Sequence, residues 1–452
     1  MKERKYNFDL AVLGAGTAGA VAAIAAADSG LKVILIDQMG TAGGSASLSL
    51  VTPMMMLYIK NNPMCSYISD EINRKMVELG AAVGKGDNWF DPMILSIVLE
   101  DMLMKRGVKV LFHTTVVGAK RDGRKICAVE TFSKSGKSEI YADYFIDATG
   151  DADVCELLNL PILHGNEEDG KNQPVSLRYI LGGVDIDAFW AFIRTHADPD
   201  AEIPPRPENY DAAVTLDMNR IFPLRGVFFE AIDKGDLLKE DATYWQVFTI
   251  PGRTDALAFN CPEFFDLHDA DDAENLTYVQ LQGKQAIMRQ LLFYKKYFKG
   301  FDHAYIAQIA SLVGIRESRR AVTDYVITKE DCHFHRKFED AVCISNYPVD
   351  IHGRKLNTYA FEAKRDPEKP YYEIPLRSLI VRDMDNLLVA GRNIGSEFVA
   401  QSSVRVMPTC RAIGEAAGIA VSIAKKKALS TLHEVDGREV KAEMLNRGAI
   451  FE

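Results

Sequence analysis

A glycine-rich turn near the N-terminus constrains this chain more than any other feature. The apolar run Phe8 to Leu13 leads into Gly14-Ala15-Gly16-Thr17-Ala18-Gly19, and an alanine-rich, helix-favouring segment follows. A second apolar run, Leu31 to Ile36, ends at Asp37. A GxGxxG pattern between a strand and a helix is typical of a β-α-β unit that binds a dinucleotide. The sequence therefore predicts a parallel, Rossmann-like sheet.

Each glycine of the pattern has its own physical reason. Gly14 allows the tight turn, Gly16 lets the backbone approach a pyrophosphate, and Gly19 lets the helix pack against the strand. The first turn of the helix, which contains Ala18, offers free N–H groups to the phosphates. Asp37 ends the second strand, where a carboxylate accepts hydrogen bonds from ribose hydroxyls and repels a 2′-phosphate.

The length and composition place limits on the kind of protein. At 452 residues the chain is too long for one core, and 47% hydrophobic with 26% charged residues is ordinary for a globular protein. The net charge of −10 argues against nucleic acid as a partner. We find no signal-peptide pattern and no stretch suited to spanning a membrane, so we expect no membrane partner and a cytoplasmic location.

The cysteines favour neither a disulfide nor a metal site. Seven cysteines at wide spacing, with no CxxC, are typical of reduced thiols. The closest cluster of metal-ligating residues, Cys332, His333 and His335, lies in one short segment that cannot easily surround an ion. We expect no metal, and we expect the two histidines to lie on a surface strand.

Three features separate FAD from a nicotinamide dinucleotide. Gly43-Gly44 follow the acidic residue, where a tight loop can return over the diphosphate. Residues 108–148 alternate with period two and contain an Asp-Gly turn, which predicts a β-meander ending in Ala148-Thr149-Gly150-Asp151. Near the far end of the chain, the strand Asn386 to Ala390 leads into Gly391-Arg392. An extended FAD needs contacts from such widely separated segments.

The rest of the chain is organised around these segments. We expect an FAD-binding domain made of residues 1–155 and 376–452, with an α+β substrate or cap domain at 156–375. Helices are predicted over 91–106, 276–299 and 409–427 from apolar spacing, and a proline- and acid-rich surface loop over 198–208. The overall prediction is an α/β fold, with a Rossmann-like parallel sheet, a β-meander and an α+β lobe.

On these motifs the chain resembles the FAD-dependent oxidoreductases allied to the glutathione-reductase-type flavoproteins. The matching stretches span nearly the whole chain and include GTAGGSASL, YFIDATGDADV, GIRESRRAVTDYVIT, YPVDIHG and NLLVAGRNIGSEFVAQSSVRVMPTCRAIGEAAGIA. Two positions depart from the pattern of those proteins. Asp37 stands where glutamate is usual, and Gly391-Arg392 replaces the Gly-Asp of disulfide reductases.

The resemblance implies a role for each of the matching residues. The pyrophosphate would lie on the first glycine loop, the adenosine ribose on Asp37, and the adenine on the backbone of Val117. The last helix would direct its N–H groups at the flavin edge where negative charge accumulates on reduction. The full set implied to bind FAD is Gly14, Gly16, Ala18, Gly19, Asp37, Gly43, Gly44, Val117, Thr149, Gly150, Asp151, Gly391, Arg392, Arg405, Val406 and Thr409.

Candidates for chemistry next to the flavin come from three segments. His352 suits proton transfer near neutral pH, and Arg405 together with the arginines of Arg316-Glu317-Ser318-Arg319-Arg320 suits a carboxylate or an enolate. Of these we favour His352, Arg319 and Arg405 as catalytic. The alternatives are an ion-pair network with Glu317, a structural loop histidine, and an Arg405 that contacts flavin or phosphate.

These observations favour an enzyme that transfers a hydride between a small organic substrate and flavin N5. An electron-transfer subunit and an RNA-modifying flavoprotein are the alternatives. The C-terminal motif argues against a plain NAD-dependent dehydrogenase, and the lack of a second GxGxxG argues against a reductase with two nucleotide sites. The substrate, the direction of reaction, the electron partner, covalent attachment of the flavin and a possible homo-oligomer are left open.

Overall fold

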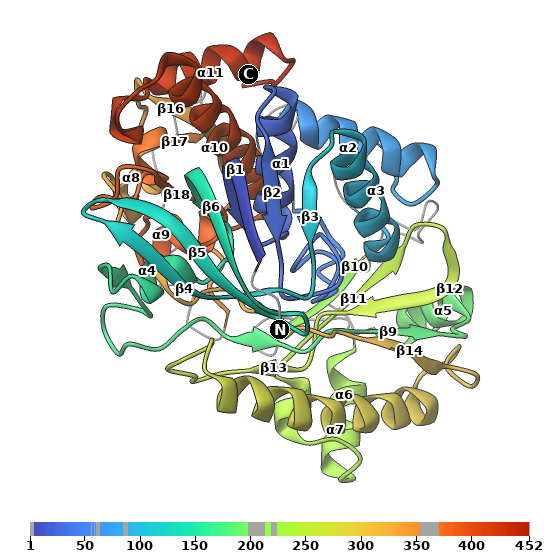
Figure 1. The fold of residues 1–452 in the computed structure, drawn as a ribbon. Coiled ribbons are helices and arrows are strands. Elements are labelled where there is room, and N and C mark those ends of the chain that lie inside the picture. The colour runs from blue at the N-terminus through green and yellow to red at the C-terminus, as the bar shows by residue number, and fades with distance from the viewer. Residues whose placement is uncertain are drawn as a thin grey trace.

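A computed structural model describes residues 4–55, 57, 59, 64–84, 89–197, 213–217, 224–352 and 370–451. The predicted surface loop at 198–208 lies outside these residues. The described chain forms two sheets, one above the other in the view of Figure 1, each with its own helices.

The first sheet is built on the predicted β-α-β unit. Its parallel strands are β3 (Lys109–Leu111), β2 (Val33–Ile36), β1 (Arg4–Leu13), β6 (Gly136–Asp147) and β18 (Leu387–Val389), in that order. All five strands end at the same edge of the sheet. In such sheets ligands bind at the carboxyl ends of the strands, so this edge positions the site.

Two helices of small residues cover one face of this sheet. Helix α1 (Thr17–Asp28) packs along α10 (Met407–Lys427), as Figure 1 shows for the blue and red helices at the top. A Cβ added to Gly414 would lie 2.2 Å from the Ala18 carbonyl oxygen, and one on Gly418 would lie 2.4 Å from that of Ala22. Larger side chains there would force the helices apart, which explains the small-residue composition of both segments.

The predicted meander is present. Strands β4 (Thr115–Asp122), β5 (Lys125–Ser133) and β6 pair antiparallel through the predicted Asp-Gly turn. The chain before the turn is divided into two strands by a break at His113, which has a φ of +54°. Before the break β3 pairs parallel with β2, and after it β4 pairs with β5.

The second sheet has five strands and two chemically different faces. Its order is β10 (Ala213–Asp217), β11 (Tyr244–Ile250), β12 (Arg253–Phe259), β9 (Tyr179–Gly182) and β14 (Tyr305–Ile309). The long helix α7 (Ala273–Tyr297) packs on one face, below the sheet in Figure 1. Trp245 Nε1 donates to the Tyr294 hydroxyl of α7, and the Tyr179 hydroxyl shares a hydrogen bond with the same group. The sheet face that carries Tyr179 and Trp245 therefore points away from the first sheet.

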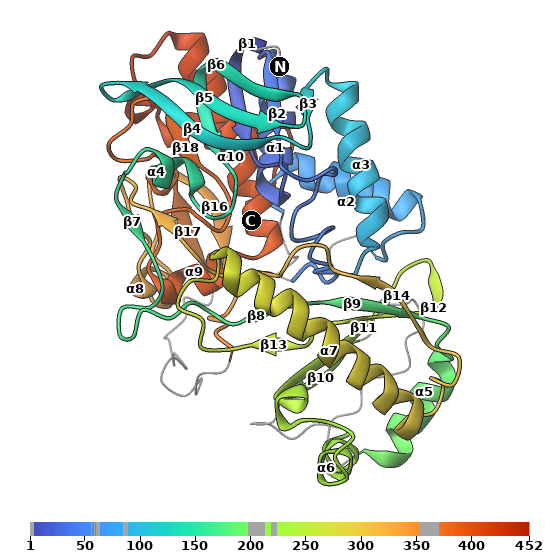
Figure 2. The same cartoon turned by 60° about the horizontal axis from the view of Figure 1, so that its bottom comes forward.

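The remaining elements are short or peripheral. Helices α2, α3 and α11 surround the first sheet, and α5 and α6 surround the second, as Figures 1 and 2 show. Their bounds are α2 (Tyr67–Glu78), α3 (Pro92–Lys105), α4 (Asp153–Leu157), α5 (Ile186–His196), α6 (Arg225–Asp233), α8 (Lys329–His333), α9 (Phe398–Val404) and α11 (Gly437–Asn446). The two-stranded pairs are β7 (Ile162–Leu163) with β15 (Arg320–Ala321), β8 (Val175–Ser176) with β13 (Glu263–Phe264), and β16 (Ala341–Ser345) with β17 (Tyr372–Pro375).

The predicted surface strand around His333 and His335 is wrong. Residues 329–333 form the helix α8, which Thr328 and Asp331 begin with a capping box. His335 is buried and has a φ of +50° after the helix ends. The capping residues favour a helix here, and their hydrogen bonds stabilise it although the alternating pattern suggests a strand.

Two hydrophobic cores underlie the two sheets. Apart from Leu50, the second core is formed by side chains between residues 175 and 313. Side chains from 321–347 and 371–451 pack into the first core with those from 10–160. The predicted α/β fold with a Rossmann-like sheet, a meander and an α+β lobe is confirmed. The domain limits at 155 and 375 stay a proposal.

Within the described residues, no single helix has the length and apolar character needed to cross a membrane. The pair α9 and α10 meets the length and composition criteria only when joined, and it bends by 91°.

Candidate functional site

A cavity of about 870 Å³ lies between the carboxyl ends of the parallel strands and the second sheet. The loops after β1, β2, β6 and β18 line one side through Gly14, Asp37, Thr149 and Gly391. The other side is lined by polar side chains of the second sheet and by the first turns of α7. The fold therefore brings together the widely separated segments that an extended dinucleotide requires.

The three glycines of the first loop differ in what surrounds them. A Cβ on Gly14 would lie 2.4 Å from the Ala148 carbonyl oxygen, and one on Gly19 would lie 1.9 Å from that of Gly14. A Cβ on Gly16 would meet only Gly44 Cα, at 4.0 Å, and Gly16 lines the cavity. Packing thus explains Gly14 and Gly19, whereas no packing contact explains Gly16, which leaves open the adjoining part of the cavity.

Two helix N-termini open onto this cavity without a side-chain cap. Helix α1 begins after Gly16, and α10 begins after Val406, and neither has a side chain that accepts from its first N–H groups. Neither helix has an acidic residue in its first turn. Uncapped N–H groups with the positive end of the helix dipole bind phosphates and other anions. Both termini fit a dinucleotide whose diphosphate lies at one helix and whose ring lies at the other.

Asp37 lines the cavity at the end of β2, as the resemblance implies. Its two carboxylate oxygens accept from the N–H groups of Ala15 and Met39, each at 2.7 Å. Each oxygen retains a lone pair for a ribose hydroxyl. Burial raises the pKa of Asp37, and these two hydrogen bonds oppose that shift.

A buried aspartate shapes the loop after β6. Asp147 has no exposed surface, and it accepts from the Thr149 hydroxyl at 2.7 Å, the Thr149 N–H at 3.1 Å and the Val154 N–H at 3.0 Å. Next to it, Asp151 accepts from Arg392 at 2.5 Å and also from Ser318. These bonds join the β6 loop to the loop after β18 beside the cavity.

Most residues implied to bind FAD line the cavity, and four do not. Those on the cavity are Gly14, Gly16, Ala18, Asp37, Gly44, Thr149, Gly150, Asp151, Gly391, Arg392, Arg405 and Val406. Gly19 and Gly43 lie behind the lining and hold the loop through packing and a Gly43 N–H to Ala15 carbonyl bond of 2.8 Å. Thr409 is fully buried, and its hydroxyl lies 3.4 Å from that of Ser345. On the meander, Val116 lines the cavity and the half-exposed Val117 does not.

The arginines after residue 315 are paired with carboxylates of the protein. Arg316 donates to Glu263 at 2.5 Å, and Arg320 pairs with Glu317. Arg319 pairs with Asp153 at 2.6 Å and Asp271 at 3.0 Å, and it donates to the Asp151 carbonyl oxygen at 2.8 Å. Arg320 thus pairs with Glu317, as the ion-pair alternative expects. Arg316 and Arg319 line the cavity while paired with other carboxylates, and the catalytic role of Arg319 stays a prediction.

His352 lies on the cavity between two carboxylates. Its Nδ1 is 2.9 Å from Glu263 Oε1, and its Nε2 is 3.2 Å from Asp350 Oδ1. Arg405 donates to the Asp350 carbonyl oxygen at 3.1 Å and lies 3.4 Å from its carboxylate. His352 and Arg405 thus meet in one charged cluster, although 52 residues separate them in the chain.

The carboxylates control the charge of His352. Burial lowers its pKa, but the attraction of Glu263 and Asp350 outweighs burial, so the pKa of His352 lies above its ordinary value. Burial acts to raise the pKa values of Glu263 and Asp350, but Arg316, Arg405 and His352 hold both below the usual range. The cluster therefore favours a protonated imidazole between two carboxylate anions.

Several residues of this cluster gave no signal in the sequence. Glu263, Tyr244 and Arg178 come from segments without a recognisable motif. Tyr244 begins β11 of the second sheet, Arg178 directly precedes β9, and Glu263 lies in β13, which pairs with β8. The Tyr244 ring lies 4.7 Å from the His352 ring. Only the pairing of distant strands brings these side chains to His352.

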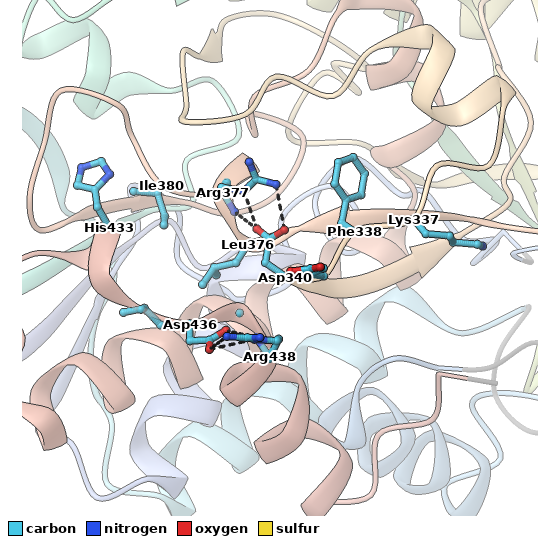
Figure 3. Close-up of a pocket in the computed structure, with 12 residues that line it drawn as sticks. Lys337, Phe338, Asp340, Leu376, Arg377, Ile380, His433, Asp436 and Arg438 are labelled. Atoms are coloured by element: carbon cyan, nitrogen blue, oxygen red, sulfur yellow. Dashed lines mark hydrogen bonds and ion pairs between the residues drawn. The ribbon is translucent and has the colours of Figure 1, made fainter.

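A second pocket, of about 440 Å³, lies on the surface away from this cavity. Figure 3 shows the pocket with Arg377 directed at Asp340 and Arg438 at Asp436. Arg377 donates to Asp340 at 2.9 Å, and Arg438 donates to Asp436 at 2.8 Å. Since these acidic side chains already have cationic partners, the pocket does not compete with the large cavity as a candidate site.

The described residues contain no group of three or more histidine, cysteine or acidic side chains that could hold a metal ion. All seven cysteines lie in the described chain as free thiols, and only Cys127 is exposed.

Comparisons with known proteins agree with this geometry. The model of the family described as "FAD dependent oxidoreductase" matches residues 9–444. A comparison with curated proteins finds no match.

Solved structures with a similar chain path are remote in sequence. A geranylgeranyl bacteriochlorophyll reductase-like protein from Thermoplasma acidophilum has 12% identity and a TM-score of 0.47, with 98% of this chain and 83% of that chain covered. The p-nitrophenol 4-monooxygenase of Pseudomonas putida has 12% identity and a TM-score of 0.47, covering 99% and 87%. A flavoprotein/dehydrogenase from Cytophaga hutchinsonii has 13% identity and a TM-score of 0.47, covering 97% and 82%. None of them identifies a substrate for this chain.

The open space at Gly16, the two uncapped helix termini and the family match over nearly the full length lead to the same assignment. The chain belongs to the family of FAD-dependent oxidoreductases, and its cofactor is FAD.

Proposed function

We propose that this protein transfers a hydride between a small organic substrate and N5 of FAD, with His352 handling the substrate proton. FAD supplies the two-electron chemistry when it is bound. The observation that carries the proposal is the position of His352, on the cavity and between Glu263 and Asp350. A histidine held this way has both a fixed ring orientation and a controlled protonation state.

His352, its two carboxylate neighbours and Arg405 have different roles in the proposed reaction. Glu263 and Asp350 orient the imidazole and favour its protonated form. A protonated His352 suits donation of a proton to a substrate that is being reduced, and the neutral form suits the reverse direction. Arg405 steadies Asp350 through its carbonyl oxygen and its carboxylate. The central lobe, proposed as a cap, covers the cavity with the second sheet and limits the access of water.

The test is a screen for small molecules that exchange electrons with the bound flavin. Oxidised protein is mixed anaerobically with amino acids, hydroxy acids and sugars, and reduced protein is mixed with enoates, while the flavin absorption band is followed. We expect at least one of these classes of small molecule to bleach the band of the oxidised flavin, or to restore it from the reduced flavin, within a catalytic turnover time. Reduction only by a partner protein would support the electron-transfer alternative and contradict the proposal.

His352→Gln should slow that reaction while FAD stays bound. Loss of a positioned general acid costs about 10²–10⁴-fold in rate. The measurement is the single-turnover rate of flavin reduction or reoxidation by the substrate from the screen, at equal flavin content. A rate within threefold of wild type would remove His352 from the mechanism.

Glu263→Gln should move the pH profile of the same rate to lower pH. The wild-type rate in the substrate-reducing direction falls as pH rises through the raised pKa of His352, since the proton is lost there. Without the Glu263 charge, the pKa of His352 falls and the decline begins at lower pH. Asp340→Asn, in the second pocket, is the matched control and should leave the midpoint unchanged.

A midpoint that stays in place in Glu263→Gln would show that another group titrates. An upward shift would contradict the assigned role of the carboxylate.

A further inference from the structure

The segment that leads into β9 of the second sheet carries a buried arginine, Arg178, which lines the cavity. Along the segment from 176 to 179, side chains alternate between the two faces, as expected for extended chain. Leu177 packs against Gly283 of α7, and the Tyr179 hydroxyl bonds to Gln290 and Tyr294 of the same helix. Ser176 and Arg178 point the other way and line the cavity.

Arg178 lacks the partner that a buried charge requires. It is 8% exposed, and its guanidinium makes no hydrogen bond and no ion pair within the part of the chain that the structure describes. Its nitrogens are not sealed among neighbouring atoms, so they face the open space of the cavity. An unpaired buried charge is strongly unfavourable, and proteins keep one where a ligand supplies the opposite charge.

The nearby carboxylates are already in use. Glu263 lies against Arg316 and His352, and Asp350 lies against Arg405 and His352. Three guanidinium groups, those of Arg178, Arg316 and Arg405, thus share two carboxylates. Positive charge is left over even when the imidazole is neutral. The excess is located at Arg178, which has no partner.

We propose that Arg178 binds the carboxylate of an organic acid substrate. This inference rests on the proposed function and names its substrate class. The planar guanidinium matches a carboxylate in two parallel hydrogen bonds, which fixes the orientation of the acid as well as its charge. Since Arg178 and His352 line the same cavity, the acid is held where the imidazole can reach its reacting carbon.

Other polar groups of the sheet complete the subsite. Tyr244, Gln246 and Asn260 line the cavity, with Gln246 Oε1 accepting from Tyr244 at 2.9 Å and from Asn260 at 3.0 Å. These groups give this wall of the cavity a polar surface.

The experiment compares the FAD-loaded protein and its Arg178→Met variant by thermal unfolding with added anions. The probes are sodium acetate, succinate and lactate, with sodium chloride and phosphate at equal ionic strength as references. We expect the carboxylates to raise the wild-type Tm beyond the effect of chloride, because they bind only the folded state. The variant should show no such response.

The variant should also have a higher Tm than wild type when no anion is added. Methionine has a similar length and carries no charge, and burial disfavours the Arg178 charge more than Tyr244 and Glu263 stabilise it. Arg178→Lys keeps the charge without the planar fork, and should give a weaker carboxylate response than wild type. Arg121→Met, at an exposed position of the meander, removes one positive charge elsewhere and should respond as wild type does.

Each other outcome overturns the inference in a recognisable way. A lower Tm for Arg178→Met would show that Arg178 neutralises Glu263 in the folded protein. Loss of FAD from the variant would place Arg178 on the cofactor. A wild-type response to phosphate alone would replace the carboxylate with an inorganic or phosphorylated ligand. If no carboxylate raises the Tm while an uncharged substrate still bleaches the flavin, the inference is wrong and the proposed function stands.

Discussion

Replacing Gly16 with leucine is expected to yield a folded protein that carries no FAD. The position tolerates a side chain as far as the protein is concerned, because a Cβ meets only Gly44 Cα at 4.0 Å and the φ of −70° is ordinary. The added atoms would fill the part of the cavity next to the first turn of α1. Losing two hydrogen bonds to phosphate, of about 1.5–3 kcal/mol each, lowers the affinity by about a hundredfold or more.

The measurement is the flavin-to-protein ratio of the purified variant, together with its circular dichroism. Gly19→Ala is the matched control, since its Cβ would lie 1.9 Å from the Gly14 carbonyl oxygen and should disturb folding itself. A Gly16→Leu protein that retains FAD at full stoichiometry would remove this loop from the cofactor site.

Glu317→Leu should lower the free energy of unfolding by about 3–5 kcal/mol. Glu317 has no exposed surface and pairs with the equally buried Arg320. It also accepts from Asn172 at 2.8 Å and from the Gly165 N–H at 3.2 Å. Leucine would leave the Arg320 charge and both other donors without this acceptor. Chemical denaturation of the two proteins gives the difference.

The double variant with Arg320→Met should recover part of this loss, because it removes the stranded charge. Arg74→Ala breaks an ion pair whose side chains are both 59% exposed, and it should change stability little. A Glu317→Leu protein as stable as wild type would mean that the pair contributes nothing to the fold.

The sequence predicted the cofactor-binding half better than the central lobe. The first β-α-β unit, the meander and the last helix have local signals, because glycine turns, period-two alternation and apolar helix faces act within a few residues. The position of the break at His113 has no local signal, since it depends on the parallel pairing of β3 with β2. The helix α8 was missed because the alternation around His333 and His335 suggested a strand, whereas the capping box of Thr328 and Asp331 favours a helix.

The candidate site divides in the same way. The positions implied to bind FAD lie in loops that follow strands, where sequence motifs report directly on backbone shape. The pairing of the arginines could not be predicted, because a run of three arginines looks like an anion site until their partners are known. In the structure these guanidinium groups face Glu263, Asp153, Asp271 and Glu317. Arg178, which stands alone in its segment and lines the cavity, has no ion pair within the described chain.

What the sequence determined by itself is the dinucleotide loop and, through the glycines and Asp37, the class of cofactor. These depend on backbone conformation, which neighbouring residues dictate. What only the tertiary structure decided is where charge is left uncompensated, because burial and pairing join side chains from strands and loops far apart in the chain. Glu263 and Asp350 raise the pKa of His352 in this way, and Arg178 becomes available for a ligand because every nearby carboxylate already has a partner.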